Sequence, residues 1–283
     1  METVQDVAQL RDRVAAARAR KLRVGFVPTM GALHEGHLSL VRRARAECGF
    51  VVVSIFVNPL QFAPGEDFAR YPRRPDEDAS LLAKAGADLL YAPDPGTFYP
   101  PGFSTSVEVA GVTEGGEGAA RPGHFRGVAT VVARLFHQVA PETAYFGRKD
   151  LQQVAVIRRM VRDLDFPVEI AVLPTVREAD GLAMSSRNAY LSPGDRLLAA
   201  ALPRALFAAR DRAASGATDP RALEEETRAE IERAGLAVDY VEAVDPETMA
   251  RAERLRPGLA LAAAVRVGKT RLIDNVLLDG RER

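Results

Sequence analysis

Residues 28–37 read Pro28-Thr29-Met30-Gly31-Ala32-Leu33-His34-Glu35-Gly36-His37, and they hold two of the four histidines of the chain. An apolar run over residues 22–27 precedes them, and Leu38, Val41 and Arg45 follow at helical spacing. The order strand, glycine-bearing turn, helix directs backbone N–H groups and a helix N-terminus toward one point, where an anion is stabilised. We therefore predict that this turn binds the phosphates of a nucleotide.

A zinc site is the first alternative for this turn. His34 and His37 are three residues apart, so they share a face if the helix has already begun. Their H-x-x-H spacing is one residue shorter than the H-E-x-x-H pattern of zinc enzymes. The chain offers one cysteine and two other histidines to complete a tetrahedral site. Phosphate binding is the favoured interpretation, although any one of these residues alone is also explained by a structural role in the turn.

Outward from this turn, apolar runs alternate with helical patterns. The predicted strands cover residues 22–27, 51–57, 88–91, 143–146 and 168–172, and the predicted helices cover 36–47, 75–85, 127–139 and 150–163. Thr3-Val4-Gln5-Asp6 resembles a capping box, which predicts a further helix from Thr3 to about Arg20. Such alternation favours a helix-covered parallel sheet of the Rossmann-like kind, in which ligands bind beyond the carboxyl ends of the strands.

The pattern changes after residue 175. Two helices rich in Ala, Arg and Glu, over 193–214 and 220–234, precede runs at 238–244, 259–267 and 271–278 that are typical of antiparallel strands. We therefore predict an α/β protein with a Rossmann-like domain at 1–175, which binds nucleotide and substrate. A smaller α+β domain at 176–283 is expected to close over the nucleotide. Residues 111–123 are rich in Gly and Glu, and we expect a surface loop there, either a lid or a flexible connection.

Charge and composition favour small-molecule partners. Lys plus Arg and Asp plus Glu balance at 38 each, so no global field attracts nucleic acid or an anionic membrane. The single cysteine, Cys48, excludes an internal disulfide, fits a reducing compartment, and is expected to be buried on a helix. The N-terminus lacks a basic region followed by an apolar one, and the apolar runs are too short to span a bilayer. We expect a cytoplasmic protein.

Two further motifs have functional character. Residues 147–153 read Gly147-Arg148-Lys149-Asp150-Leu151-Gln152-Gln153 at the end of a predicted strand. There a lysine can bind phosphates, an aspartate can accept from a ribose hydroxyl, and Gln152 or Gln153 can bind a polar substrate. The alternative is an aspartate helix cap followed by solvated amides. Residues 184–188 read Met184-Ser185-Ser186-Arg187-Asn188, whose hydroxyls and guanidinium suit phosphate oxygens, although serine-rich loops are common.

Together these motifs carry a family resemblance. In order and spacing, the chain resembles over essentially its whole length the pantothenate synthetases (pantoate–β-alanine ligases), of the HIGH superfamily of nucleotidyltransferase-like enzymes. The resemblance rests on residues 28–37, 56–62 (Phe-Val-Asn-Pro-Leu-Gln-Phe), 121–128 (Arg-Pro-Gly-His-Phe-Arg-Gly-Val), 149–153 and 184–188. One position departs from the family pattern, because Arg148 stands where the family favours Glu.

The resemblance implies an enzyme that ligates (R)-pantoate and β-alanine with ATP through a pantoyl-adenylate, releasing AMP and pyrophosphate. It also implies Mg²⁺ and a homodimer. In that family pattern His34 and His37 contact the phosphates, with His37 as proton donor, while Lys149, Ser185, Ser186 and Arg187 hold the triphosphate with Mg²⁺. The ATP-binding residues that it implies are Met30, Gly31, Ala32, Leu33, His34, Glu35, Gly36, His37, Gly147, Arg148, Lys149, Asp150, Val176, Met184, Ser185, Ser186 and Arg187.

Pantoate has a carboxylate, hydroxyls and a gem-dimethyl group, so its pocket needs amides beside apolar walls. By the resemblance, Gln61 and Gln153 bind pantoate and β-alanine shares Gln61, while Pro28, Met30, Phe56 and Val132 are candidate walls. The metal ligands stay open, with Asp78 as a candidate. Two other functions remain as alternatives: transfer of AMP to a phosphate ester, and a nucleotide-binding regulatory module without turnover.

Overall fold

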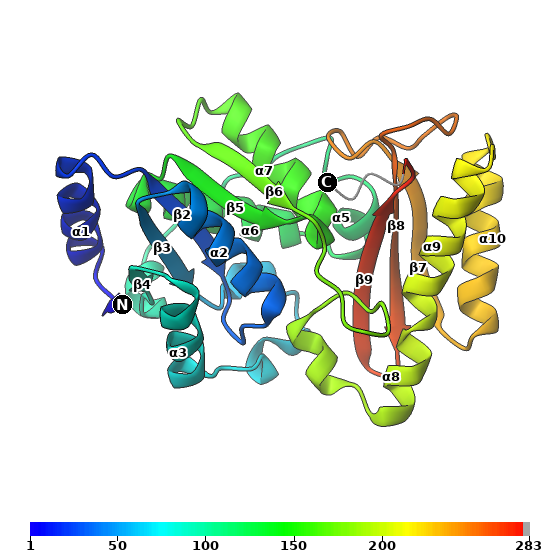
Figure 1. The fold of residues 1–283 in the computed structure, drawn as a ribbon, viewed down its shortest axis with the longest axis horizontal. Helices are drawn as coiled ribbons and strands as arrows, with labels where there is room; N and C mark the ends of the chain where they lie inside the picture. Colours follow the sequence, from blue (N-terminus) through cyan, green and yellow to red (C-terminus); the bar gives the residue numbers. More distant parts are fainter. Residues whose placement is uncertain (280–283) are drawn as a thin grey trace. The chain divides into compact units, whose positions relative to one another are not determined.

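The computed structural model describes residues 1–279, which fall into two compact units (Figure 1). The first unit comprises Met1–Val109, Pro122–Gly147 and Val156–Leu173. The second comprises Ala110–Arg121, Arg148–Ala155 and the chain from Pro174 onward. The chain therefore enters the second unit twice before its C-terminal part begins.

The first unit is built on a parallel sheet. Within residues 1–279, its six strands lie in the order β1-β4-β3-β2-β5-β6, which confirms the predicted Rossmann-like architecture. Their bounds are β1 Glu2–Val4, β2 Val24–Thr29, β3 Phe50–Ile55, β4 Leu89–Tyr91, β5 Thr143–Gly147 and β6 Glu169–Leu173. Strand β2 pairs with β3 on one side and with β5 on the other. The strand order reverses there, and ligands of such sheets bind at the carboxyl ends beside a reversal.

Helices cover this sheet. They are α1 Val7–Ala19, α2 Glu35–Glu47, α3 Pro75–Ala85, α4 Pro95–Phe98 and α6 His124–Val139, and α7 Leu151–Asp163 passes from the second unit into the first. Figure 1 draws α2 in front of the strands and α6 behind them. Helix α2 buries Leu38, Val41 and Ala44 against Val51 and Val53 of β3. Cys48 at its C-terminus is 5% exposed, which confirms the predicted buried thiol.

The predicted helix from Thr3 is wrong at its start. Residues Glu2–Val4 form strand β1, which pairs in parallel with β4, and Val4 is buried. Asp6 caps the helix instead, since its Oδ1 accepts the N–H groups of Ala8 at 2.7 Å and Gln9 at 3.2 Å. The pairing partner of β1 lies far along the chain, and a local capping pattern carries no information about it.

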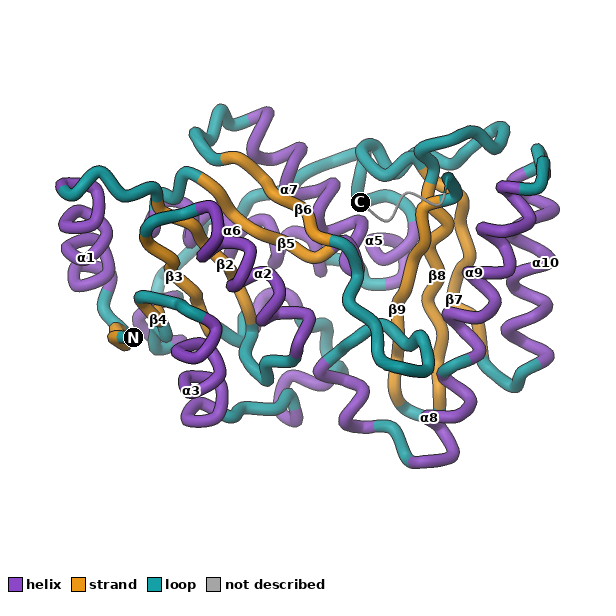
Figure 2. The backbone as a smooth tube through the Cα atoms, viewed as in Figure 1, coloured by secondary structure: helices purple, strands orange, loops and turns teal. Residues whose placement is uncertain are grey.

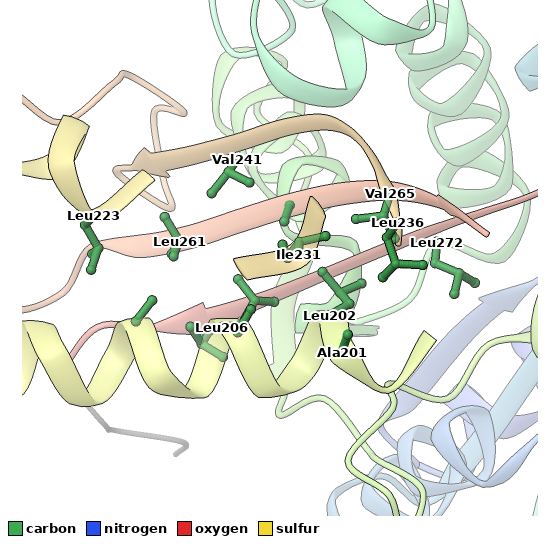
Figure 3. Packing of buried hydrophobic residues seen from close by; sticks show 14 of the residues in the cluster. Ala201, Leu202, Leu206, Leu223, Ile231, Leu236, Val241, Leu261, Val265 and Leu272 are labelled. Carbon is green, nitrogen blue, oxygen red and sulfur yellow. The ribbon is translucent and has the colours of Figure 1, made fainter. Parts of the chain in front are cut away.

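The second unit is built on an antiparallel sheet, as predicted. In the part of the chain that the structure describes, its three strands are β7 Ala237–Val244, β8 Ala260–Val267 and β9 Thr270–Leu277, in that order (Figure 2). Helices α8 Pro193–Ala199, α9 Ala201–Ala214 and α10 Pro220–Arg233 accompany it. Figure 3 shows Leu202 and Leu206 of α9 directed toward strand β8, which carries Leu261 and Val265, within one buried cluster.

Two predictions for this unit need correction. The predicted helix over 193–214 is interrupted at Ala200, because Pro203 in the first turn of α9 lacks the N–H that would continue α8. The predicted surface loop at 111–123 contains the helix α5 Gly116–Ala120, and its Glu117 is only 6% exposed. The Gly-rich composition of this segment gives no indication that Glu117 is buried. Among residues 1–279, no helix is long and apolar enough to cross a membrane.

Candidate active site

The turn after β2 has an unusual backbone. Gly31 has a φ of +81° and Ala32 a φ of +49°, both in the left-handed region. A Cβ at Gly31 would lie 3.0 Å from Asp78 Oδ2 and 3.0 Å from Ile55 Cγ2, so space as well as conformation requires glycine there. These constraints fix the backbone conformation of the turn before α2 begins at Glu35.

Asp78 holds that shape from α3. Its carboxylate is 2% exposed, and its two oxygens accept the N–H groups of Ala32 and Leu33, each at 2.8 Å. The Gly31 N–H in turn donates to Thr29 Oγ1 at 3.2 Å. Burial raises the pKa of the Asp78 carboxyl, and the two N–H donors oppose that rise. The backbone N–H groups of the turn thus bond within the protein, and their role as ATP ligands stays a prediction.

The two histidines lie side by side at the start of α2. Their ring centroids are 4.1 Å apart with an interplanar angle of 40°, and the His34 N–H faces His37 Nδ1 at 3.4 Å. Both side chains are partly exposed. Because Nδ1 of His37 accepts, its neutral imidazole carries the hydrogen on Nε2. His37 can therefore present an N–H donor, as an oxygen of a phosphate requires.

Gln61 and Met30 are brought together in the first unit. Gln61 ends the short helix η1 Pro59–Gln61 and is 9% exposed. Its Nε2 lies 3.0 Å from Met30 Sδ, and its Oε1 accepts from Asn58 Nδ2 at 3.0 Å. The Gln61 carbonyl is 2.8 Å from His124 Nδ1. The predicted substrate glutamine is thus held by hydrogen bonds beside Met30 of the histidine turn.

Asn58 is the hub of this arrangement, and no role was predicted for it from the sequence. It is 1% exposed, its Nδ2 also donates to the Gly127 carbonyl at 3.1 Å, and its Oδ1 accepts from Tyr99 OH at 3.0 Å. A Cβ at Gly127 would lie 2.2 Å from the Leu60 carbonyl oxygen, so only glycine lets α6 approach η1 this closely. A glycine inside a helical pattern was the signal available in the sequence.

Two of the candidate apolar walls, Phe56 and Val132, are buried. Phe56 is 4% exposed and packs against Phe98, with ring centroids 4.2 Å apart, and against Tyr99 at 5.8 Å. Val132 on α6 is 5% exposed, and Pro28 is half-buried. Amides next to aromatic and aliphatic surface suit a small, branched hydroxy acid.

In the second unit, Lys149 lies in the short helix η3 Arg148–Asp150. Its side chain is 19% exposed, and Nζ lies 3.4 Å from Asp150 Oδ1. Of the two candidate glutamines, Gln152 is 4% exposed and bonds to the Glu117 N–H and to the Val112 carbonyl, at 2.8 and 2.9 Å. Gln153 is the partly exposed one. Gln152 therefore holds the 112–117 segment, and the role of Gln153 in binding substrate stays a prediction.

The segment over 176–188 forms a turned-back loop in the same unit. The Met184 N–H donates to the Val176 carbonyl at 3.0 Å, and Ser185 Oγ accepts the Arg187 N–H at 3.2 Å. Asn188 Nδ2 donates to Glu178 Oε1 at 2.8 Å. Ser185, Ser186 and Arg187 are all half-buried. Among residues 1–279, no group of three or more His, Cys, Asp or Glu side chains is arranged to hold a metal ion.

The chain is similar to known proteins over its whole length. The family model described as Pantoate-beta-alanine ligase matches residues 2–277. A pantothenate synthetase from Moorella thermoacetica is 54% identical over 283 residues, with 99% of each chain covered. The crystal structure of pantothenate synthetase from Thermus thermophilus has a TM-score of 0.93 at 52% identity, covering 98% of this chain and 99% of that one. A Francisella tularensis pantoate-beta-alanine ligase, complexed with beta-gamma ATP and β-alanine, has a TM-score of 0.83 at 33% identity, covering 100% of both chains.

Proposed function

Because the chain belongs to the pantoate-beta-alanine ligase family, it ligates pantoate and β-alanine with ATP, and we propose that a pantoyl-adenylate forms at the turn over residues 28–37. The observation that carries this proposal is the make-up of that turn. It includes Met30, which contacts Gln61, and it ends at the paired rings of His34 and His37. The turn thus carries groups suited to phosphates and contacts a glutamine suited to a hydroxy acid, and proximity of the two reactants is what adenylation needs.

The first chemical step joins two anions. A carboxylate oxygen of pantoate attacks the α-phosphorus of ATP, the bond from that phosphorus to the bridging oxygen breaks, and pyrophosphate leaves with the electron pair. We propose that Nε2–H of His37 stabilises the charge that develops on the phosphate oxygens, with His34 beside it. Gln61 and Gln153 are proposed to bind the pantoate hydroxyls and carboxylate.

In the second step, the neutral amine of β-alanine attacks the acyl carbon of the adenylate. The carbon–nitrogen bond forms, the amine loses a proton, and AMP leaves. This route needs no covalent bond to the enzyme. We propose that β-alanine uses Gln61, whose buried amide is already oriented by Asn58.

The motifs over residues 147–153 and 184–188 are proposed to contribute phosphate ligands. Lys149, Ser185, Ser186 and Arg187 carry cationic or hydroxyl groups on partly exposed side chains, as a triphosphate requires. The remaining proposed ATP contacts of these two segments and of the preceding strand are Gly147, Arg148, Asp150, Val176 and Met184. The support for this set is the family resemblance of the two motifs.

We further propose that Mg²⁺ accompanies ATP. The two oxygens of Asp78 accept the N–H groups of Ala32 and Leu33, so this carboxylate does not fit a ligand role. Phosphate oxygens and water are the ligands that Mg²⁺ prefers when it comes with a nucleotide. Bound there, the ion would neutralise charge on the leaving pyrophosphate.

A homodimer and a cytoplasmic location are also proposed. Their support is the family resemblance and the use of ATP as a substrate. Sedimentation of the purified chain tests the first. A monomer at micromolar concentration would contradict it.

The decisive experiment is an assay with ATP, pantoate and β-alanine, each omitted in turn. ATP and pantoate alone should support exchange of labelled pyrophosphate into ATP, and all three should yield pantothenate with AMP. Pantothenate formation without any exchange would contradict the separate adenylate step. Transfer of AMP to a phosphate ester, with the dinucleotide retained, would favour the alternative reaction, and ATP binding without turnover would favour a regulatory module.

A further inference from the structure

Two adjacent polar residues are buried in strand β9. Asp274 is 2% exposed and Asn275 is 3% exposed, although β9 lies at the edge of the three-stranded sheet. Successive side chains of a strand point to opposite faces. Asp274 shares its face with Leu272 and Val276 of the main buried cluster of this unit, while Leu277 shares the other face with Asn275 and packs near Leu151. The side chains of Asp274 and Asn275 therefore point to opposite faces of the sheet.

Asn275 reaches the backbone that carries Lys149. Its Nδ2 donates to the carbonyl oxygens of Arg148 and Lys149, at 3.0 Å each. A primary amide has two N–H groups, so each carbonyl receives one of them. The Oδ1 atom of Asn275 has no hydrogen-bond partner within residues 1–279. A buried acceptor without a partner lowers the stability of the fold, so Oδ1 contributes nothing favourable. The favourable interactions of this side chain are the two hydrogen bonds that Nδ2 donates.

Asp274 fixes Asn275 itself. Its two oxygens pair with Arg177 Nη1 and Nη2, at 2.7 and 3.0 Å, and Oδ1 accepts the Asn275 N–H at 2.7 Å. Arg177 Nη2 also donates to the Asn275 carbonyl at 3.2 Å. Both backbone groups of Asn275 are thus held by one buried ion pair. The backbone of Arg177 in turn forms an isolated antiparallel β-bridge with Ala183, the residue directly before the Met184 motif.

We propose that Asn275 is a positioning residue for Lys149, acting by clamping the peptide groups of residues 148 and 149. This inference rests on the proposed role of Lys149 in binding ATP. Lys149 is a flexible cation, and its reach is set by where its backbone is held. If the clamp is lost, the ammonium group is displaced, and a displacement of about 1 Å in a reacting complex lowers the rate by about 100-fold.

The test uses the full-length enzyme with Asn275→Ala and Asn275→Asp. The alanine removes both donors, and the aspartate keeps the shape but turns acceptors toward two carbonyl oxygens. Both variants should raise KM for ATP and slow pyrophosphate exchange by about 10-fold or more, with KM for pantoate unchanged. A purely structural role predicts instead that activity falls in proportion to the folded fraction, with both KM values unchanged.

Ile273→Val is the matched control, because Ile273 lies on the same strand and the same face and carries no polar group. It should leave both KM values unchanged. A folded Asn275→Ala with the wild-type KM for ATP and the wild-type exchange rate would overturn the proposal. If that variant does not fold, Asn275→Ser takes its place, and a wild-type KM for ATP in the folded serine variant would overturn the proposal equally.

Lys149→Ala separates this inference from the function on which it rests. A wild-type KM for ATP in Lys149→Ala would remove the proposed role of Lys149. An effect in Lys149→Ala without one in the Asn275 variants would remove the positioning role alone. If the ATP role of Lys149 and the positioning role of Asn275 are both correct, adding Asn275→Ala to Lys149→Ala should raise KM for ATP little further. The clamp then has no cation to position.

Discussion

The turn over 28–37 and the segments around Lys149 and Ser185 are supported in different ways. The first is self-contained in sequence: its two histidines and two glycines lie within ten residues, and one carboxylate from α3, Asp78, holds its backbone. In the second, the Lys149 segment receives two hydrogen bonds from Asn275, which is separated from Lys149 by 126 positions. A functional segment that supports itself is visible in the sequence, whereas one supported by a distant strand is visible only in the fold.

The largest effect should come from the self-contained turn. We expect His37→Ala to slow pantoate-dependent pyrophosphate exchange by about 10²- to 10⁴-fold, since it removes a donor to the phosphate oxygens. The melting temperature should stay close to that of the wild type, because the imidazole is partly exposed. His34→Ala measures which ring matters more to the step. A wild-type exchange rate in His37→Ala would refute its catalytic role.

Removal of Asp78 tests how far the turn supports itself. Asp78→Ala leaves the N–H groups of Ala32 and Leu33 without their acceptors, and we expect exchange to fall by about 10- to 100-fold. Each buried donor left unsatisfied should cost about 1–3 kcal/mol of unfolding free energy, measured by denaturant titration. Asp76→Ala is the control, since Asp76 is exposed in the same first turn of α3. Equal effects of the two variants would show that the turn holds its shape alone.

The sequence predicted the parts of the molecule that are encoded locally. The alternation of strands and helices predicted the parallel sheet, and the density of His and Gly predicted the turn as a site of interest. It missed β1, because Val4 is buried by pairing with residues 89–91, and it missed Glu117, which bonds to Tyr240 at 3.0 Å and to Arg271 from inside a Gly-rich stretch. In these cases the contacting residue lies far along the chain, and a single sequence does not show which distant residues will be in contact.

A smaller effect should separate substrate binding from phosphate binding within the first unit. We expect Gln61→Ala to raise KM for pantoate or β-alanine by about 10-fold, because a buried amide that contacts substrate contributes about 1–2 kcal/mol. KM for ATP should not change. Asn58→Ala should reproduce part of the effect, since Asn58 orients Gln61 Oε1 from 3.0 Å. Unchanged KM values for all substrates in Gln61→Ala would contradict the assignment.

The smallest expected effect is the pH dependence of folding stability, which has opposite signs for Glu178 and for Asp78. Hydrogen bonds from Arg196 hold the pKa of the Glu178 carboxyl below its usual value, so Glu178 stabilises the fold above about pH 4.3 and loses that contribution as the pH falls through its folded pKa. Burial raises the pKa of Asp78, so its contribution is present in acid and is lost as the pH rises through its folded pKa.

Melting temperatures of Glu178→Gln and Asp78→Asn, each compared with the wild type at neutral and acidic pH, measure both signs. The advantage of the wild type over Glu178→Gln should shrink in acid, from at most about 1 kcal/mol, because the Arg196 pair is partly exposed. The advantage of the wild type over Asp78→Asn should grow in acid, because a protonated Asp78 no longer carries a buried charge. If both differences move in the same direction, the two carboxylates do not have the opposite environments that their burial and partners indicate.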